Sequence, residues 1–185
     1  FACIGLGFML IEVSQMQRLI IFLGHPTYSL SVVLFSLLLS SGLGSFSIGR
    51  ICHPELGGKA VARLILLLTV LALFGVLTPQ LIRQFRESTT VVRILVATGI
   101  LSPLGFFMGM AFPLGMRSAS AHSASLTPWL WGINGAASVL ASVLAIVISL
   151  SSGISAAFWT GFLCYALGVA VFLWSSQTRE RSQAA

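Results

Sequence analysis

The sequence predicts an all-α integral membrane protein with six transmembrane helices, on three observations. Hydrophobic residues make up 57% of the 185 residues and charged residues only 8%, far below the roughly 25% charged residues of soluble domains. Six apolar stretches approach the roughly 20 helical residues needed to cross about 30 Å of hydrocarbon. Gly, Pro and charged residues separate these stretches. The predicted transmembrane domain covers residues 1–176, with spans at 1–23, 28–48, 61–77, 94–112, 129–150 and 154–174, and a polar tail follows at 177–185.

Basic residues lie mainly between the spans. A net charge of +6 would suggest nucleic acid in a soluble protein, but here the Arg and Lys residues act as topology determinants beside a lipid bilayer. We therefore expect no nucleic-acid partner. The N-terminus, the second and fourth connections and the C-terminus carry Arg50, Lys59, Arg63, Arg117, Arg179 and Arg181, and the opposite side carries Arg18, Arg83, Arg86 and Arg93. This bias predicts cytoplasmic N- and C-termini.

The first span holds Glu12, which is the only acidic residue in any apolar segment. A charged side chain in hydrocarbon is costly and normally faces the interior of a helix bundle, so the other helices are expected to enclose it. Gln15 and Arg18 continue a polar stripe from Glu12. Because Glu12 and Arg18 lie about 9 Å apart along the axis, Gln15 is expected to bridge them. The chain starts with Phe1 and has no signal-peptide pattern, so we expect a fragment, a processed chain or part of a longer protein.

Small residues dominate one face of the second span. The connection at 24–27 is short and contains Pro26, so the first two helices are expected to be antiparallel neighbours. Small residues at helical spacing allow close approach of helix backbones in lipid. The second span is therefore expected to be a packing helix rather than a ligand site; its small residues are Ser29, Ser36, Ser40, Ser41, Gly44, Ser45 and Gly49.

The third span is expected to end at Thr78-Pro79. The connection before it, at residues 50–59, has neither nucleotide-binding glycine pattern and is expected to be a polar loop. After Pro79, apolar residues alternate with Arg83, Arg86 and Glu87. This pattern suits a short amphipathic helix at the membrane interface, acting as an anchor or binding an anionic headgroup.

The last three spans repeat some features of the first three. Pro103 predicts a kink in the fourth span, and Gly105 and Gly109 form a GxxxG packing motif. Trp129 and Trp131 place the start of the fifth span at an interface. Asn134 begins a face of small residues in that span and is expected to face another helix.

The sequence also suggests an internal repeat. Leu-Gly-Phe-Met at residues 6–9 resembles residues 104–108, and the small-residue spans lie about 100 residues apart. Two three-helix halves would be inverted relative to each other, which is a building plan of secondary transporters.

Glu12 has three candidate roles. The simplest role is structural, with hydrogen bonds to polar groups such as Asn134 or Ser40. Alternatively, Glu12 binds a transported solute or takes up a proton during transport, or it takes part in catalysis. The three histidines fall in connections, so haem is disfavoured. No zinc spacing, paired carboxylates or Ser-His-Asp set occurs, and the chain has no Asp. We expect no metal, no cofactor and no enzymatic activity by this chain alone.

Three sequence blocks carry a resemblance to a known family. They are GLGFMLIEVSQMQRLIIFLGHPTYSLSVVLFSLLLSSGLGS at 5–45, GMAFPLGMR at 109–117 and WGINGAASVLASVLA at 131–145. The chain resembles the membrane-spanning region of bacterial spermidine-synthase-like proteins, in which major-facilitator-like helices are joined to a soluble aminopropyltransferase-like domain. The resemblance implies a bacterial inner membrane and a missing soluble domain, which would hold the catalytic residues. The motif positions of unknown role are Glu12, Gln17, Arg18, Gly24, His25, Pro26, Pro113, Arg117 and Asn134.

Two functions follow as hypotheses. The first is a non-catalytic membrane module, either a scaffold subunit of a larger membrane complex or the membrane part of a spermidine-synthase-like protein. The alternative is transport or sensing of a small cationic solute such as a polyamine. In that case Glu12, Gln15, Arg18 and Asn134 are the candidate binding residues.

Overall fold

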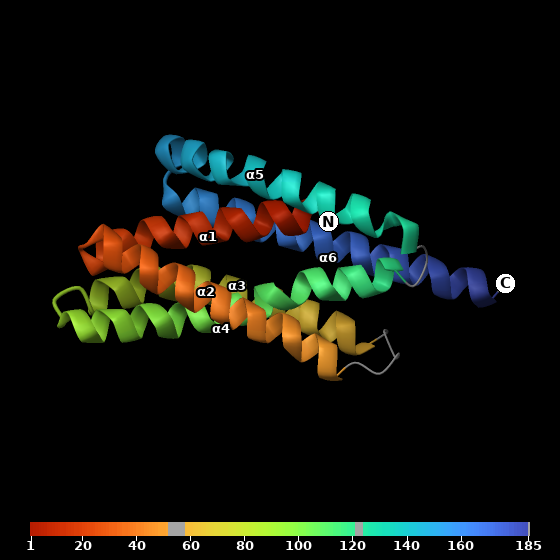
Figure 1. Cartoon of the computed structure of the whole chain (residues 1–185), viewed down its shortest axis with the longest axis horizontal. Coiled ribbons are helices and arrows are strands. Elements are labelled where there is room, and N and C mark those ends of the chain that lie inside the picture. The colour runs from red at the N-terminus through yellow and green to blue at the C-terminus, as the bar shows by residue number, and fades with distance from the viewer. Residues whose placement is uncertain (52–57, 121–123, 185) are drawn as a thin grey trace.

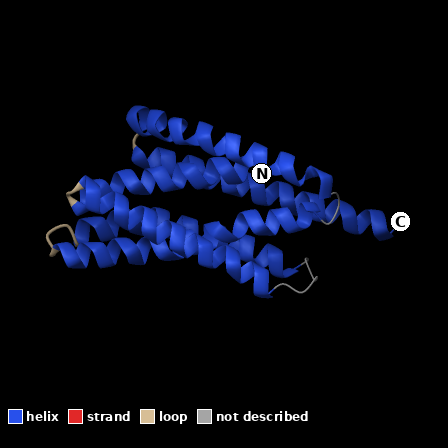
Figure 2. Ribbon diagram, in the orientation of Figure 1, coloured by secondary structure: helices blue, strands red, loops and turns tan. Residues whose placement is uncertain are grey.

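Six long helices form the protein (Figures 1 and 2). The structure is a computed structural model that describes residues 1–51, 58–120 and 124–184. Each of the six helices is long and apolar enough to cross a membrane, and no strand occurs in the described residues. The predicted all-α membrane protein with six spans is therefore confirmed. The helices are α1 (Ala2–Leu23), α2 (Pro26–Ile51), α3 (Gly58–Gln84), α4 (Thr90–Ser120), α5 (Thr127–Ser152) and α6 (Ile154–Ala184), with a 3₁₀ turn η1 (Ala124–Leu126) before α5.

Glycines make two of the tight connections. Gly24 ends α1 in the left-handed conformation, with φ of 77°, and its N–H donates to the carbonyl of Ile20 at 3.1 Å. Gly153 separates α5 from α6 with φ of 93°. Only glycine adopts such angles without steric cost. The α1–α2, α3–α4 and α5–α6 connections lie at one end of the bundle, and both termini lie toward the other end (Figure 1).

The predicted break at Thr78-Pro79 is wrong, because α3 continues through Pro79 to Gln84. Proline is tolerated inside membrane helices where neighbouring helices support the backbone. Here Ile82 and Phe85 pack against a buried cluster that includes Leu19 and Phe22 of α1. Residues 81–84 are therefore the packed end of a spanning helix rather than a separate helix at the interface.

Other helix ends also extend beyond the predicted spans. α4 begins at Thr90 and ends at Ser120, and α6 continues to Ala184, so it includes residues 177–184 of the predicted polar tail. Most of the polar connection predicted at 50–59 lies outside the described residues.

α2 and α4 form the closest helix pair. A Cβ atom added to Gly109 of α4 would lie 2.6 Å from the Cα of Ser41, and one added to Gly44 of α2 would lie 2.9 Å from the carbonyl carbon of Phe106. Neither position has room for a side chain. The predicted roles of the small-residue face of α2 and of the GxxxG motif of α4 in close packing are confirmed.

The helices form two groups. α1 packs mainly against α5 and α6, and α4 packs mainly against α2 and α3, with smaller contacts between the groups (Figure 1). Exchanging α1 with α4, α2 with α5 and α3 with α6 converts the contacts of α1 with α5 and α6 into those of α4 with α2 and α3, but the contact between α5 and α6 has no counterpart of similar extent between α2 and α3. The exchanged contacts of α1 and α4 are the pattern that two inverted three-helix repeats would produce, with each half contributing helices to both groups.

Matching side chains occupy the two equivalent contacts. Gly105 of α4 lies against Ser40 of α2, whose hydroxyl donates to the carbonyl of Ser36 at 2.5 Å. Gly5 of α1 lies against Ser138 of α5, whose hydroxyl donates to the carbonyl of Asn134 at 2.9 Å. In each pair the serine satisfies its hydroxyl within its own helix and leaves space for the glycine of the neighbouring helix.

Candidate functional site

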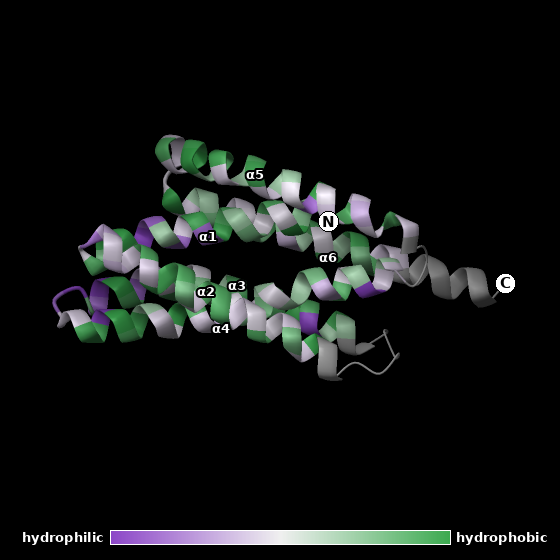
Figure 3. Cartoon of the chain, in the orientation of Figure 1, coloured by the Kyte–Doolittle hydropathy of each residue, from purple (hydrophilic) through white to green (hydrophobic). Residues whose placement is uncertain are grey.

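α1 carries its polar stripe into the interior of the bundle. Only 8% of Glu12, none of Gln15 and 8% of Arg18 is exposed. Hydrophilic residues interrupt the apolar surface of α1 toward its C-terminal end (Figure 3). α1 is also the most enclosed span, with 56% of its apolar window buried compared with 11% for α5. The prediction that neighbouring helices enclose Glu12 is confirmed.

Arg18 is held by α6. Its Nη2 donates to the Ser155 hydroxyl at 3.0 Å, and its Cζ lies 5.4 Å from the centre of the Phe158 ring. This distance permits a cation–π interaction. The Nη1 atom is buried without a hydrogen-bond partner. Arg18 therefore connects α1 to the start of α6 and is not directed at Glu12.

Gln15 does not bridge Glu12 and Arg18. Its Oε1 and Nε2 atoms are both buried and make no hydrogen bond to the described residues. A buried polar group without a partner costs free energy. The predicted bridge is wrong because Arg18 turns toward α6, which leaves the Gln15 amide between two charged groups that it does not contact.

No hydrogen bond or ion pair joins the Glu12 carboxylate to another described residue, although its charge acts on Tyr165 of α6. Neither of its two expected structural partners bonds to it. Ser40 donates to carbonyls of its own helix, and the Asn134 Oδ1 atom is buried without a partner. The hypothesis that Glu12 is a structural group hydrogen-bonded to Asn134 or Ser40 is wrong for these two partners. Asn134 does face another helix, as predicted, because its carbonyl lies against Gly5 of α1.

A groove of about 440 Å³ lies between α1, α2, α4 and α5. Its lining includes Phe8 and Met9 of α1, Ser41 of α2, and Asn134 of α5. Glu12 follows Phe8 by four residues and Met9 by three, so it lies one helical turn further along the same side of α1. The Asn134 Oδ1 atom is a hydrogen-bond acceptor without a partner in this groove, and Glu12 lies one turn beyond its α1 wall without lining it.

The remaining motif positions do not gather at this groove, with the exception of Pro113, which lines it. Gly24 caps α1, and Pro26 begins α2. The His25 ring is exposed and lies 5.1 Å from the Tyr28 ring. Gln17 has a buried Oε1 atom without a partner, and Arg117 lies in the last turn of α4.

Sequence reasoning missed three polar residues, of which Thr78 and Tyr165 are buried and Ser155 is exposed. Ser155 binds Arg18, and the hydroxyls of Thr78 and Tyr165 are buried without partners. Tyr165 carried a signal, because tyrosine in a membrane helix usually lies at the interface and this one lies in the middle of an apolar segment. Ser155 and Thr78 carried none, since both lie near helix ends where polar residues are common.

No group of three or more His, Cys, Asp or Glu side chains capable of holding a metal occurs within the described part of the chain. The fold and the buried charged residues define a polytopic α-helical membrane protein. No family model, curated protein or solved structure matches the chain.

Proposed function

We propose that this membrane protein binds a small cationic solute, such as a polyamine, at Glu12 and in the groove beside it, for transport or sensing. The observation that carries the proposal is the buried Glu12 carboxylate, which has no partner among the described residues. Arg18, the only Lys or Arg in α1, is engaged by Ser155 and Phe158 and does not neutralise it. A cation from outside the chain would supply the missing charge.

The chemistry of the groove fits an ammonium compound. An ammonium group has only hydrogen-bond donors, and the unpartnered Asn134 Oδ1 and Glu12 carboxylate oxygens are both acceptors. Asn134 lies against Gly5, seven residues before Glu12, which corresponds to about 10 Å along α1. A solute with two or more ammonium groups on a flexible chain can reach both acceptors.

The position of the groove supports transport in particular. The groove is lined by helices of both packing groups, α1 and α5 from one and α2 and α4 from the other. In secondary transporters built from inverted repeats, the substrate site lies near the bilayer midplane between repeats. Glu12 lies near the middle of α1, at the equivalent depth.

A second candidate is a structural module of a larger membrane assembly or of a spermidine-synthase-like protein. The observation that favours it is the exposure of α5, in which only Ala141 and Ala145 are buried. Lipid or another subunit would cover its remaining apolar side chains. In this proposal the membrane is the bacterial inner membrane, the termini are cytoplasmic, a soluble domain is joined there, and the chain itself is not an enzyme.

Equilibrium binding of radiolabelled spermidine to the purified chain in nanodiscs tests the first proposal. Glu12→Gln keeps the size of the side chain and removes its charge, and we expect it to weaken binding at least about tenfold, which corresponds to about 1.4 kcal/mol. Glu87→Gln is the matched control, because Glu87 is exposed near the α3–α4 connection. Equal binding by the wild type and Glu12→Gln, with both folded, would exclude Glu12 as the binding group.

A further inference from the structure

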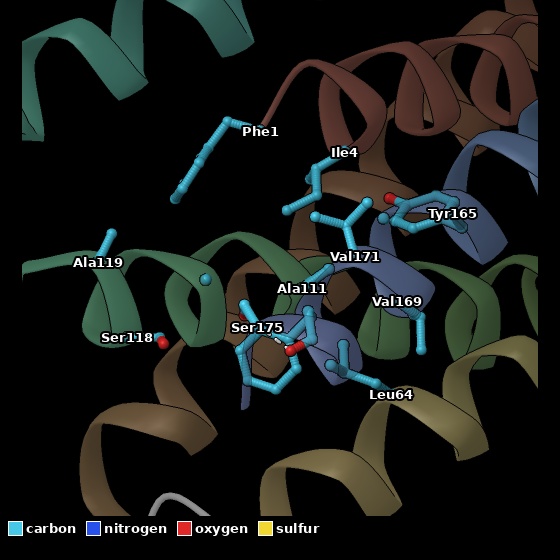
Figure 4. A pocket seen from close by; sticks show the side chains of 13 residues that line it. Phe1, Ile4, Leu64, Ala111, Ser118, Ala119, Tyr165, Val169, Val171 and Ser175 are labelled. Atoms are coloured by element: carbon cyan, nitrogen blue, oxygen red, sulfur yellow. Dashed lines mark hydrogen bonds between the residues drawn. The ribbon is translucent and has the colours of Figure 1, made fainter. Parts of the chain in front are cut away.

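A second cavity, of about 230 Å³, lies between the N-terminal end of α1, the C-terminal half of α4, and α6 (Figure 4). Its walls are largely apolar and include Ile4, Leu64, Ala111 and Phe172. An engineered apolar cavity of about 150 Å³ is large enough to bind benzene. This cavity therefore has room for a substituted ring.

Tyr165 lines the cavity with a hydroxyl that lacks a hydrogen-bond partner. Only 2% of its surface is exposed, and its Oη atom is buried without a partner in the described chain. In Figure 4 the hydroxyl lies on the side of the ring that faces Ile4 and the other lining side chains. Ser175, also in the lining, donates instead to the carbonyl of Phe172 at 2.8 Å. The Tyr165 hydroxyl is thus available to a bound acceptor.

The depth of Tyr165 restricts what that acceptor can be. Tyr165 is eleven residues after Ile154, the first residue of α6, which places it about 17 Å along the helix and near the middle of a hydrocarbon layer about 30 Å thick. The ester carbonyls of bilayer lipids lie at the edges of that layer and do not reach it. A neutral compound that dissolves in the hydrocarbon can bring its own carbonyl oxygen to the depth of Tyr165.

We propose that this cavity is a binding site for a lipophilic ring compound with a carbonyl oxygen, the chemistry of a quinone, which accepts a hydrogen bond from Tyr165. Val171 lines the cavity and is 61% exposed on the outer surface of α6. Ligand would enter there from the lipid. Glu12 does not line the cavity, although its charge acts on Tyr165.

The test measures the thermal unfolding midpoint of the full chain in nanodiscs as decylubiquinone is added, since a ligand that binds the folded state raises this midpoint. We expect a saturable rise for the wild type. Tyr165→Phe keeps the ring and removes the hydroxyl, and it should raise the half-saturating concentration about fivefold to tenfold, as loss of one hydrogen bond does. Tyr28→Phe is the matched control, because Tyr28 is exposed, and it should behave as the wild type does.

A second variant fills the cavity without touching Tyr165. A Cβ atom added to Gly115 would lie 3.4 Å from Phe1 and 3.6 Å from Ile4, which are ordinary contacts with two lining residues. Gly115→Leu should lose the response to decylubiquinone, and a circular dichroism spectrum equal to that of the wild type shows that the variant is folded. No saturable response in the wild type, an unchanged response in Tyr165→Phe, or an equal response to decylbenzene, which has no carbonyl, would each overturn the proposal. Asn134→Ala alters the solute groove and does not touch this cavity, so it should leave the response unchanged, which separates this result from failure of the solute site.

Discussion

Arg18 illustrates how one polar residue is accommodated in the membrane. Its guanidinium bonds to Ser155 and faces the Phe158 ring, so one residue of α1 joins the beginning of α6 through both a hydrogen bond and a ring contact. Hydrogen bonds to charged groups are stronger than neutral ones, although polar contacts between membrane helices are often worth less than expected. The interaction should therefore stabilise the α1–α6 contact measurably.

Replacing Ser155 tests this contribution. Ser155→Ala should destabilise the folded protein by about 1–2 kcal/mol, because the Arg18 Nη2 atom loses its acceptor. The measurement is thermal or denaturant unfolding of the purified protein in detergent. Ser151→Ala is the control, because the exposed Ser151 hydroxyl bonds only within its own helix, to the carbonyl of Ile148 and to the Ser152 hydroxyl. If both variants unfold at the same point, the Arg18–Ser155 bond adds nothing to stability.

For single residues, the sequence predicts which polar side chains are buried better than it predicts their hydrogen-bond partners. Burial of Glu12 could be predicted because a carboxylate facing lipid is too costly. The partners of Glu12, Gln15 and Arg18 could not, since the residue that meets Arg18 lies 137 positions away and depends on how α1 and α6 cross. The bridge predicted through Gln15 failed for that reason.

Among the helices, α2 and α4 approach each other through glycine and serine. Gly44, Gly105 and Gly109 each bring the two backbones so close that a Cβ atom would meet backbone or a serine hydroxyl. Lipid gives helices no hydrophobic reason to associate, so close van der Waals contact is the main attraction. The sequence predicts this contact well because small residues at helical spacing have few other uses in a membrane helix.

Two glycines of α2 provide a direct test of that contact. Gly44→Ala should destabilise the protein by about 1–3 kcal/mol, because α2 and α4 must separate to admit the methyl group. Gly42→Ala, two residues earlier, meets nothing within 4 Å and should change stability little. The measurement is the unfolding midpoint of both variants in detergent. A lower midpoint for Gly44→Ala alone shows that close packing is responsible, and not a general effect of replacing glycine in α2. Equal unfolding midpoints would contradict the packing account.

Pro79 shows the limit of local reasoning about elements. Proline normally ends a soluble helix, but in α3 the turn beyond it packs on Leu19 and Phe22 of α1, so the helix continues. Packing between α3 and α1 outweighs the tendency of proline to end a helix. This packing cannot be predicted from the residues around Pro79 alone.

At the scale of the whole molecule, the six helices form two packing groups, one around α1 and one around α4. The number and approximate positions of the six spans could be predicted from hydrophobic length alone. The division into α1 with α5 and α6, and α4 with α2 and α3, could not, because apolar segments do not encode their neighbours. Glu12 and Asn134 could be chosen from the sequence as candidate binding residues, but the groove and the Tyr165 cavity exist only in this tertiary arrangement.

Cysteine labelling tests the topology. In a background without the three native cysteines, Thr27→Cys, Thr89→Cys and Ser152→Cys should react with a membrane-impermeant maleimide from one side of the membrane. Ser120→Cys should react from the opposite side, because α4 crosses between Thr89 and Ser120. All four positions are exposed. Reaction of Ser120→Cys from the same side as Thr89→Cys would contradict six crossings.

The most direct test of a cation-binding carboxylate inside the bundle is its reaction with dicyclohexylcarbodiimide, a lipophilic reagent for carboxyl groups, followed by mass spectrometry of the peptides. We predict an adduct at Glu12 whose yield falls as spermidine is added, and no such adduct in Glu12→Gln. An adduct at Glu12 that spermidine does not suppress at any concentration, in protein that remains folded, would contradict the account.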